Sequence, residues 1–254
     1  MPRTAREKSK TGIYHIMLRG IDRRYIFLDD SDREKFLYYL FRAKEISEFE
    51  LYAYCLMGNH VHLLMRESGE LGDNVKRIAV GYVQWFNNRH GRTGHLFQNR
   101  YRSEAIESER YLVAAARYIH QNPVKAKMVK KAGDYEWSSY KDYIDFYKGK
   151  STSIDPGLIA AYFSTQESFE EFMNKPNDDK FLDYEVKQKY TDKDLLSRIN
   201  GIVDINSLAR LPKNERDKII LEIYNMTGAS MRQLSRVMGI GRSIIENAVR
   251  NSEL

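Results

Sequence analysis

Residues 51–65 constrain the fold more than any other segment of this chain. The segment is apolar and is interrupted by Gly58-Asn59, a dipeptide typical of the turn in a β-hairpin. The sequence therefore predicts two antiparallel strands, at residues 51–57 and 60–65. Residues i and i+2 of a strand share a face, so His60 and His62 would project side by side and could each give a nitrogen to one metal ion. Core histidines that hydrogen-bond to backbone groups produce the same pattern.

Patterns typical of strands and helices alternate along the first half of the chain. The expected elements are a strand at 12–19, a helix at 30–46, the hairpin at 51–65, a helix at 73–89, a strand at 97–106 and a helix at 109–121. This order matches the split βαβ arrangement of a ferredoxin-like α/β sandwich, in which helices cover an antiparallel sheet. We therefore expect an α+β fold followed by an all-α C-terminal region.

Three parts are expected along the chain. They are an α/β domain at 1–147, a connector with short helices at 148–190, and a helical domain at 191–254. In the last part, apolar positions on both sides of Gly239 follow the spacing of a helix-turn-helix. The polar face of its second helix, with Arg242 and Ser243, could meet a DNA major groove, whereas an ordinary helical hairpin remains the alternative.

The charge distribution favours a polyanionic partner. Lys and Arg number 41 against 35 Asp and Glu, a net charge of +6, and the excess lies mainly in residues 1–24 and 117–131. Basic clusters interleaved with aromatic residues are typical of nucleic-acid binding. The candidate phosphate contacts are Arg19, Arg23, Arg100 and Arg102. The last two are expected to share a strand face, although a solvated basic face explains each arginine equally well.

Cysteine content and hydropathy indicate the compartment. The chain has one cysteine, Cys55, which excludes an internal disulfide framework and agrees with a reducing cytosol. The first residues lack an apolar signal core, and no apolar run approaches the ~20 residues that span a bilayer. The sequence therefore predicts a cytoplasmic protein without a membrane partner.

The predicted helix at 109–121 carries side chains suited to phosphate chemistry. Tyr118 and Asn122 are four residues apart, so on a helix they stack on one face, and an amide oxygen there could join a metal site beside a tyrosine hydroxyl. A metal that polarises a phosphate next to a fixed tyrosine oxygen is typical of phosphoryl transfer. Asn122 precedes Pro123, which favours a departure from helical geometry at that residue.

Four sequence blocks together resemble a known family. These are residues 14–20 (Tyr-His-Ile-Met-Leu-Arg-Gly), 57–64 (Met-Gly-Asn-His-Val-His-Leu-Leu), 94–98 (Gly-His-Leu-Phe-Gln) and 118–126 (Tyr-Ile-His-Gln-Asn-Pro-Val-Lys-Ala). They resemble the single-tyrosine HUH transposases, most closely the REP-associated tyrosine transposases, over about residues 10–140 and in matching order. The resemblance implies a ferredoxin-like catalytic domain that cleaves and rejoins single-stranded DNA through a transient 5′-phosphotyrosine, and substrates that contain hairpin repeats.

The resemblance assigns roles to individual residues. It makes Tyr118 the nucleophile, His60 and His62 ligands of a divalent metal, and Asn122 the third ligand, with Gln121 as the adjacent alternative. The expected ion is Mg²⁺ or Mn²⁺, although imidazole ligands also accept Zn²⁺ or Ni²⁺.

Partners and rival functions stay open at this point. Duplex DNA would bind through the C-terminal helices, and both a monomer and a homodimer agree with the resemblance. One rival is a non-catalytic DNA-binding regulator that acts through the helix-turn-helix, and a second is a metal-dependent nuclease that uses water as nucleophile.

Overall fold

The computed structural model describes residues 7–176, 181, 191–208, 211–227 and 229–250. The chain divides into two compact units, Met1–Asp183 and Tyr184–Leu254. The predicted connector at 148–190 falls mostly in the first of them, and its residues 177–180 and 182–190 lie outside the described residues.

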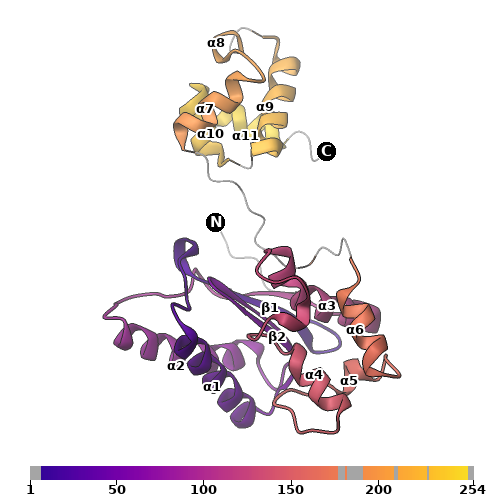
Figure 1. The fold of residues 1–254 in the computed structure, drawn as a ribbon. Helices are drawn as coiled ribbons and strands as arrows, with labels where there is room; N and C mark the ends of the chain where they lie inside the picture. The colour runs from indigo at the N-terminus through magenta and orange to yellow at the C-terminus, as the bar shows by residue number, and fades with distance from the viewer. Residues whose placement is uncertain (1–6, 177–180, 182–190, 209–210, 228, 251–254) are drawn as a thin grey trace. The chain divides into compact units, whose positions relative to one another are not determined.

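An antiparallel four-stranded sheet forms the centre of the first unit (Figure 1). The strands are β1 (Ile13–Arg19), β2 (Glu50–Met57), β3 (His60–Arg66) and β4 (Arg102–Ala105), in the order β2-β3-β1-β4. With α1 (Asp30–Ser47) after β1 and α2 (Leu71–Arg89) after β3, this is the ferredoxin-like topology expected from the sequence. The α+β prediction and the hairpin around Gly58-Asn59 are confirmed.

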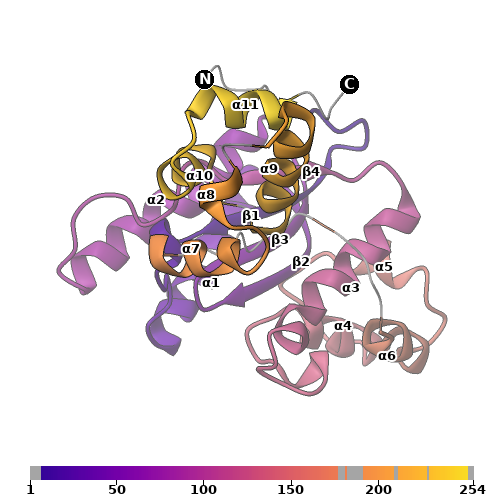
Figure 2. The same ribbon diagram turned by 90° about the horizontal axis from the view of Figure 1, so that it is seen from above.

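Helices cover both faces of the sheet (Figures 1 and 2). On one face, α1 and α2 pack together, and Phe41 of α1 contacts Tyr54 of β2 with ring centroids 6.1 Å apart. On the other face lies α3 (Glu109–Lys125), whose Tyr118 contacts His62 of β3 at 5.9 Å. The histidines and the α1–α2 pair therefore occupy opposite sides of the sheet.

A buried carboxylate joins α1 to α2 at one end. Asp32, in the first turn of α1, is fully buried and accepts hydrogen bonds from the Leu28 backbone N–H at 2.7 Å and from Arg89 at 2.8 Å. The ring nitrogen Nε2 of His90 lies 2.9 Å from the same carboxylate. A buried charge is tolerated when it is paired and hydrogen-bonded, as it is here.

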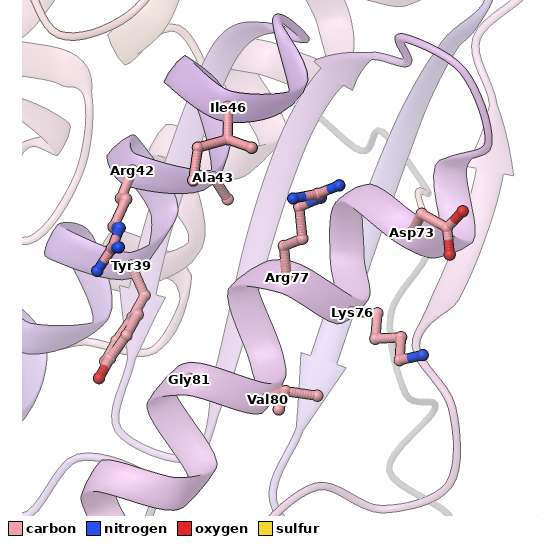
Figure 3. Close-up of a pocket in the computed structure, with 9 residues that line it drawn as sticks. All are labelled: Tyr39, Arg42, Ala43, Ile46, Asp73, Lys76, Arg77, Val80 and Gly81. Carbon is pink, nitrogen blue, oxygen red and sulfur yellow. The ribbon is translucent and has the colours of Figure 1, made fainter.

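A hollow lies between the same two helices, on the face away from the histidines (Figure 3). Tyr39, Arg42, Ala43 and Ile46 of α1 line it, together with Asp73, Lys76, Arg77, Val80 and Gly81 of α2. A Cβ added at Gly81 would come within 2.5 Å of the Tyr39 ring, so glycine allows the close crossing.

The helices that follow α3 complete the core of the first unit. They are α4 (Tyr140–Tyr147), α5 (Gly157–Ala160) and α6 (Gln166–Asn174). Ile154, Ile159, Phe169 and Met173 are buried in the same core as the sheet. Most of the segment expected to connect two domains is therefore packed structure, and its apolar residues close the core beside α3.

The second unit is helical and has its own apolar core. Its helices are α7 (Asp192–Asn200), α8 (Ile205–Leu208), α9 (Lys213–Thr227), α10 (Met231–Met238) and α11 (Arg242–Arg250). Gly239 ends α10 with a φ of 66°, in the left-handed region that glycine adopts without strain, and the Ser235 hydroxyl donates to the Ile240 carbonyl at 2.7 Å. The expected turn between the last two helices is confirmed.

Candidate functional site

Strand register places both predicted metal-binding histidines on the sheet face that α3 covers. His60 and His62 alternate along β3, and their ring centroids are 4.9 Å apart. His62 is fully buried and pairs with Met17 of β1, whereas His60 is partly exposed and pairs with Arg19. The two imidazoles are adjacent at the start of β3, as the predicted hairpin requires.

The turn before His60 is held by a second loop. The Gly20 N–H donates to the Asn59 carbonyl at 2.9 Å, the Ile26 N–H donates to the Gly58 carbonyl at 3.0 Å, and the Asn59 side chain donates to the Arg23 carbonyl at 3.2 Å. A Cβ added at Gly58 would lie 2.8 Å from the Tyr25 ring, so a larger residue there would displace this loop. These bonds fix the two residues that directly precede His60.

The Tyr118 ring contacts His62 and His15 edge-on. Its ring centroid is 5.9 Å from that of His62 and 5.8 Å from that of His15, and the Nζ of Lys125 lies 4.6 Å from it. The side chain is buried, with 4% of its surface exposed, and the Phe181 ring lies against it at 5.1 Å. The predicted nucleophile therefore lies beside His62, whose own neighbour along the strand face is His60.

Asn122 stays helical, contrary to the departure that Pro123 suggested. The helix α3 continues to Lys125, and the Asn122 Nδ2 donates to the Tyr118 carbonyl at 2.9 Å and more weakly to the Ile119 carbonyl at 3.5 Å. Proline has no N–H for the Ile119 carbonyl, so this amide partly replaces the missing backbone donor. The carboxamide oxygen of Asn122 is the part of the side chain that could bind a metal.

Gln121 points to a different neighbour. Its Nε2 donates to the carbonyls of Met173 and Lys175, at 2.7 and 2.9 Å, at the C-terminal end of α6. This geometry gives Gln121 a structural role between α3 and α6, and it favours Asn122 over Gln121 as the third ligand.

The His62 side chain fits a metal. Burial, and then the neighbouring His60 and His15, hold the pKa of His62 well below its usual value, so the ring is neutral, as a ligand must be. Its Nε2 is buried without a hydrogen-bond partner in the described part of the chain, whereas its Nδ1 lies 2.9 Å from Nε2 of His15. Within those residues, no group of three or more His, Cys, Asp or Glu side chains is arranged to hold a metal ion.

The four predicted phosphate-binding arginines lie in different settings. Arg19 of β1 pairs with His60 of β3, so the two share a sheet face. Arg102 of β4 pairs with Met17 of β1, which pairs on its other side with His62. Arg19 and Arg102 therefore both lie on the sheet face that carries His60 and His62. Arg23 is in the loop that holds the Gly58-Asn59 turn. The expectation that Arg100 and Arg102 share a strand face is wrong, because β4 begins at Arg102 and Arg100 lies in the exposed loop before it.

Sequence reasoning did not find three further residues at this site. They are His15, Glu104 and Tyr111. His15 lies beside His62, the Glu104 carboxylate lies 3.6 Å from the other side of the His15 ring, and the Tyr111 hydroxyl donates to Glu104 at 2.6 Å. Strand alternation puts His15 on the same face as Met17 and Arg19, but only the register between β1 and β4 sets Glu104 opposite His15.

In the second unit, Arg242 and Ser243 are exposed at the start of α11, and Arg242 donates to Glu246 at 2.8 Å. The polar face of α10 is instead tied to α7, because Arg236 and Gln233 both donate to Asp192. Exposed polar side chains of the predicted helix-turn-helix therefore lie on both helices, with Arg232 and Arg236 on α10 and Arg242 and Ser243 on α11.

Comparisons with known proteins match the first unit. Residues 8–122 match the family described as transposase IS200 like. A relative described as a REP-associated tyrosine transposase of Haemophilus influenzae is 28% identical over 152 residues, which are 53% of this chain and 83% of the relative. Among the described residues, no helix is long and apolar enough to cross a membrane.

Two solved structures are similar to this chain. One is a REP-associated tyrosine transposase bound to a REP hairpin (21% identity, TM-score 0.49, 63% of this chain and 93% of that one). The other is a transposase from Deinococcus radiodurans (16% identity, TM-score 0.33, 50% of this chain and 92% of that one). At these scores, the fold assignment depends on the sheet topology of this chain itself.

Proposed function

Because residues 8–122 are similar to the IS200-like transposases, we propose that this protein is a metal-dependent DNA transposase that cleaves and rejoins single-stranded DNA through Tyr118. The observation that carries the proposal is the placement of the Tyr118 ring beside His62 and His15, on the face where His60 and His62 lie side by side. A nucleophile next to two candidate metal ligands is the arrangement that phosphoryl transfer needs.

His60, His62 and the amide oxygen of Asn122 would hold the ion, Mg²⁺ or Mn²⁺. When bound, the ion would withdraw charge from a phosphate oxygen. Arg19 and Arg102, on the same sheet face, are suited to binding the DNA phosphates on either side of the scissile one.

Tyr118 carries the covalent step. Its phenolic oxygen attacks the phosphorus, the bond from phosphorus to the 3′ oxygen breaks, and the phenolic proton is transferred to the released 3′ oxygen, which becomes a hydroxyl. The 5′ end is then a phosphotyrosine, which conserves the energy of the phosphodiester bond, so a 3′-hydroxyl can reseal the strand without ATP.

We assign the DNA-contacting surface of the second unit to α11, whose Arg242 and Ser243 are exposed and suited to duplex DNA. The substrate of the first unit would be single-stranded DNA that contains a hairpin, in line with the sequence resemblance. A regulator that only binds duplex DNA remains the second candidate, supported by that exposed polar face.

A denaturing gel with labelled hairpin DNA and Mn²⁺ tests the proposal. The variants are Tyr118→Phe, His60→Ala and, as a matched control, Tyr162→Phe, which removes the hydroxyl of an exposed tyrosine. We expect a covalent protein–DNA band with the unaltered protein and with Tyr162→Phe, and none with the other two. Cleavage that persists in Tyr118→Phe would instead mean a nuclease that uses water. Duplex binding without any cleavage would favour the regulator.

A further inference from the structure

Three side chains from adjacent strands form a row that ends at His62. Glu104 of β4 pairs with His15 of β1, and Nδ1 of His15 lies 3.6 Å from the Glu104 carboxylate. On the other side of the same ring, Nε2 of His15 lies 2.9 Å from Nδ1 of His62. The Tyr111 hydroxyl of α3 donates to the second Glu104 oxygen at 2.6 Å, which fixes the carboxylate.

The Glu104 carboxylate determines which ring nitrogen of His15, and then of His62, carries the proton. At 3.6 Å the contact is longer than a hydrogen bond, but a negative carboxylate attracts an N–H and repels a ring lone pair, so the His15 nitrogen that faces Glu104, Nδ1, is the one that carries the proton. With one proton on its ring, His15 presents a lone pair at Nε2, and the bond to His62 then requires a proton on His62 Nδ1. This leaves the lone pair of His62 on Nε2.

The opposite arrangement, in which His15 and His62 each carry the proton on Nε2, is disfavoured. It would put an N–H on His62 Nε2, an atom that is buried without a hydrogen-bond partner in the described residues, and it would turn the lone pair of His15 Nδ1 toward the Glu104 carboxylate. Orphaned buried N–H donors are rarer and more costly than unsatisfied acceptors. A metal ligand needs a lone pair, and the arrangement with the proton on His62 Nδ1 leaves one on His62 Nε2, directed away from His15.

We propose that Glu104 and His15 are positioning residues that hold His62 in its Nδ1–H tautomer, so that Nε2 is available to a divalent metal. The metal part of this inference rests on the proposed function, whereas the tautomer does not. Such outer partners of a ligating histidine fix its ring orientation and typically change metal affinity by ~10–100-fold when removed.

The tautomer is measured in the metal-free protein by long-range ¹⁵N–¹H NMR of the His62 ring. We expect Nδ1–H in the unaltered protein. In Glu104→Gln, the Tyr111 hydroxyl holds the amide oxygen and the amide NH₂ then faces His15, so the direction of the row reverses and His62 shifts toward Nε2–H. Glu107→Gln is the matched control, because the Glu107 carboxylate accepts from the Lys10 backbone N–H and stands outside the row. An Nε2–H tautomer in the unaltered protein, or an unchanged tautomer in Glu104→Gln, would overturn the inference.

Titration with Mn²⁺ gives the second readout. We expect the dissociation constant to rise ~10–100-fold in Glu104→Gln, to rise less in Tyr111→Phe, and to stay the same in Glu107→Gln. A metal affinity that is equal in all four proteins would overturn the metal part. If the tautomer responds as expected but the unaltered protein binds no Mn²⁺ and cleaves no DNA, the proposed function fails while the positioning of His62 by Glu104 and His15 stands.

Discussion

Acidification should destabilise the first unit through His120, a histidine of α3 whose side chain packs against α4. The ring is fully buried between Tyr140 and Tyr143, and its Nε2 lies 2.9 Å from the Ser139 hydroxyl. Burial lowers the pKa of His120 from 6.5 to about 3. The folded unit therefore keeps this ring neutral at pH values where the unfolded chain protonates it.

The sign and size follow from linkage. Below roughly pH 6.5 the unfolded chain binds a proton that the folded unit rejects until the pH approaches the lowered pKa, so stability falls as the pH decreases through that window. With the two pKa values above, the free energy of unfolding should fall by ~2 kcal/mol between pH 7 and pH 5 from this residue. Glutamine at this position does not titrate, so His120→Gln should lose the ~2 kcal/mol share of the pH dependence that His120 contributes, even though it lowers stability at pH 7.

Urea denaturation followed by tryptophan fluorescence measures the effect, because Trp85 and Trp137, the two tryptophans of the chain, both lie in the first unit. The quantity to compare is the change in unfolding free energy from pH 7 to pH 5 in each protein. Other buried groups, such as His62, titrate in both and cancel in the difference. If the unaltered protein and His120→Gln lose the same stability, the assignment of the pH dependence to His120 is refuted.

Three further predictions concern other parts of the first unit. Asp32→Ala should lower the unfolding free energy by ~2–4 kcal/mol, because it leaves Arg89, His90 and the Leu28 N–H without their buried acceptor. Asp30→Ala removes an exposed carboxylate and should change the unfolding free energy little. Urea titration of the two variants compares these effects. Gln121→Leu should lower the free energy of unfolding by ~1–2 kcal/mol, because it removes two hydrogen bonds to the end of α6, yet it should keep the affinity for Mn²⁺. Asn122→Leu should instead weaken Mn²⁺ binding, as measured by calorimetry. The opposite result would make Gln121 the ligand. Cys55 is buried and its thiol pKa is raised by burial, so iodoacetamide should label it at least ~100-fold more slowly in the native protein than in guanidinium, as mass spectrometry can follow.

The parts of the fold that local sequence signals determine were predictable. The Gly58-Asn59 turn and the alternation after it set the hairpin and placed His60 and His62 on one face. Tyr118 could be placed on a helix because Ser108 caps the start of that helix. These signals act over a few residues and need no knowledge of what packs against them.

Two elements differ from the prediction because of backbone details. The strand expected at 97–106 shortens to β4, because Asn99 adopts a φ of 58° and separates the bridge at Phe97 from the ladder that begins at Arg102. The helix α3 passes through Pro123 because the Asn122 side chain bonds back to the preceding turn. Neither effect shows in the periodicity of apolar residues.

Long-range partners could not be predicted from the sequence. Glu104 lies opposite His15 only because β4 pairs with β1, and Asp32 meets Arg89 only because α1 and α2 are neighbours. The row of side chains that ends at His62 therefore depends on strand register, which no single segment of the chain specifies.

The bonds that join the Gly58-Asn59 turn to residues 20–26 bear on how this domain can change in length. Hairpin turns are usually where a protein accepts extra residues, because their tips are exposed and make few bonds. Here the turn accepts backbone bonds from Gly20 and Ile26, and the residue that follows it is His60. A library of short insertions along the chain should therefore retain active members at the exposed turn around Gly149 and lose them at 58–59.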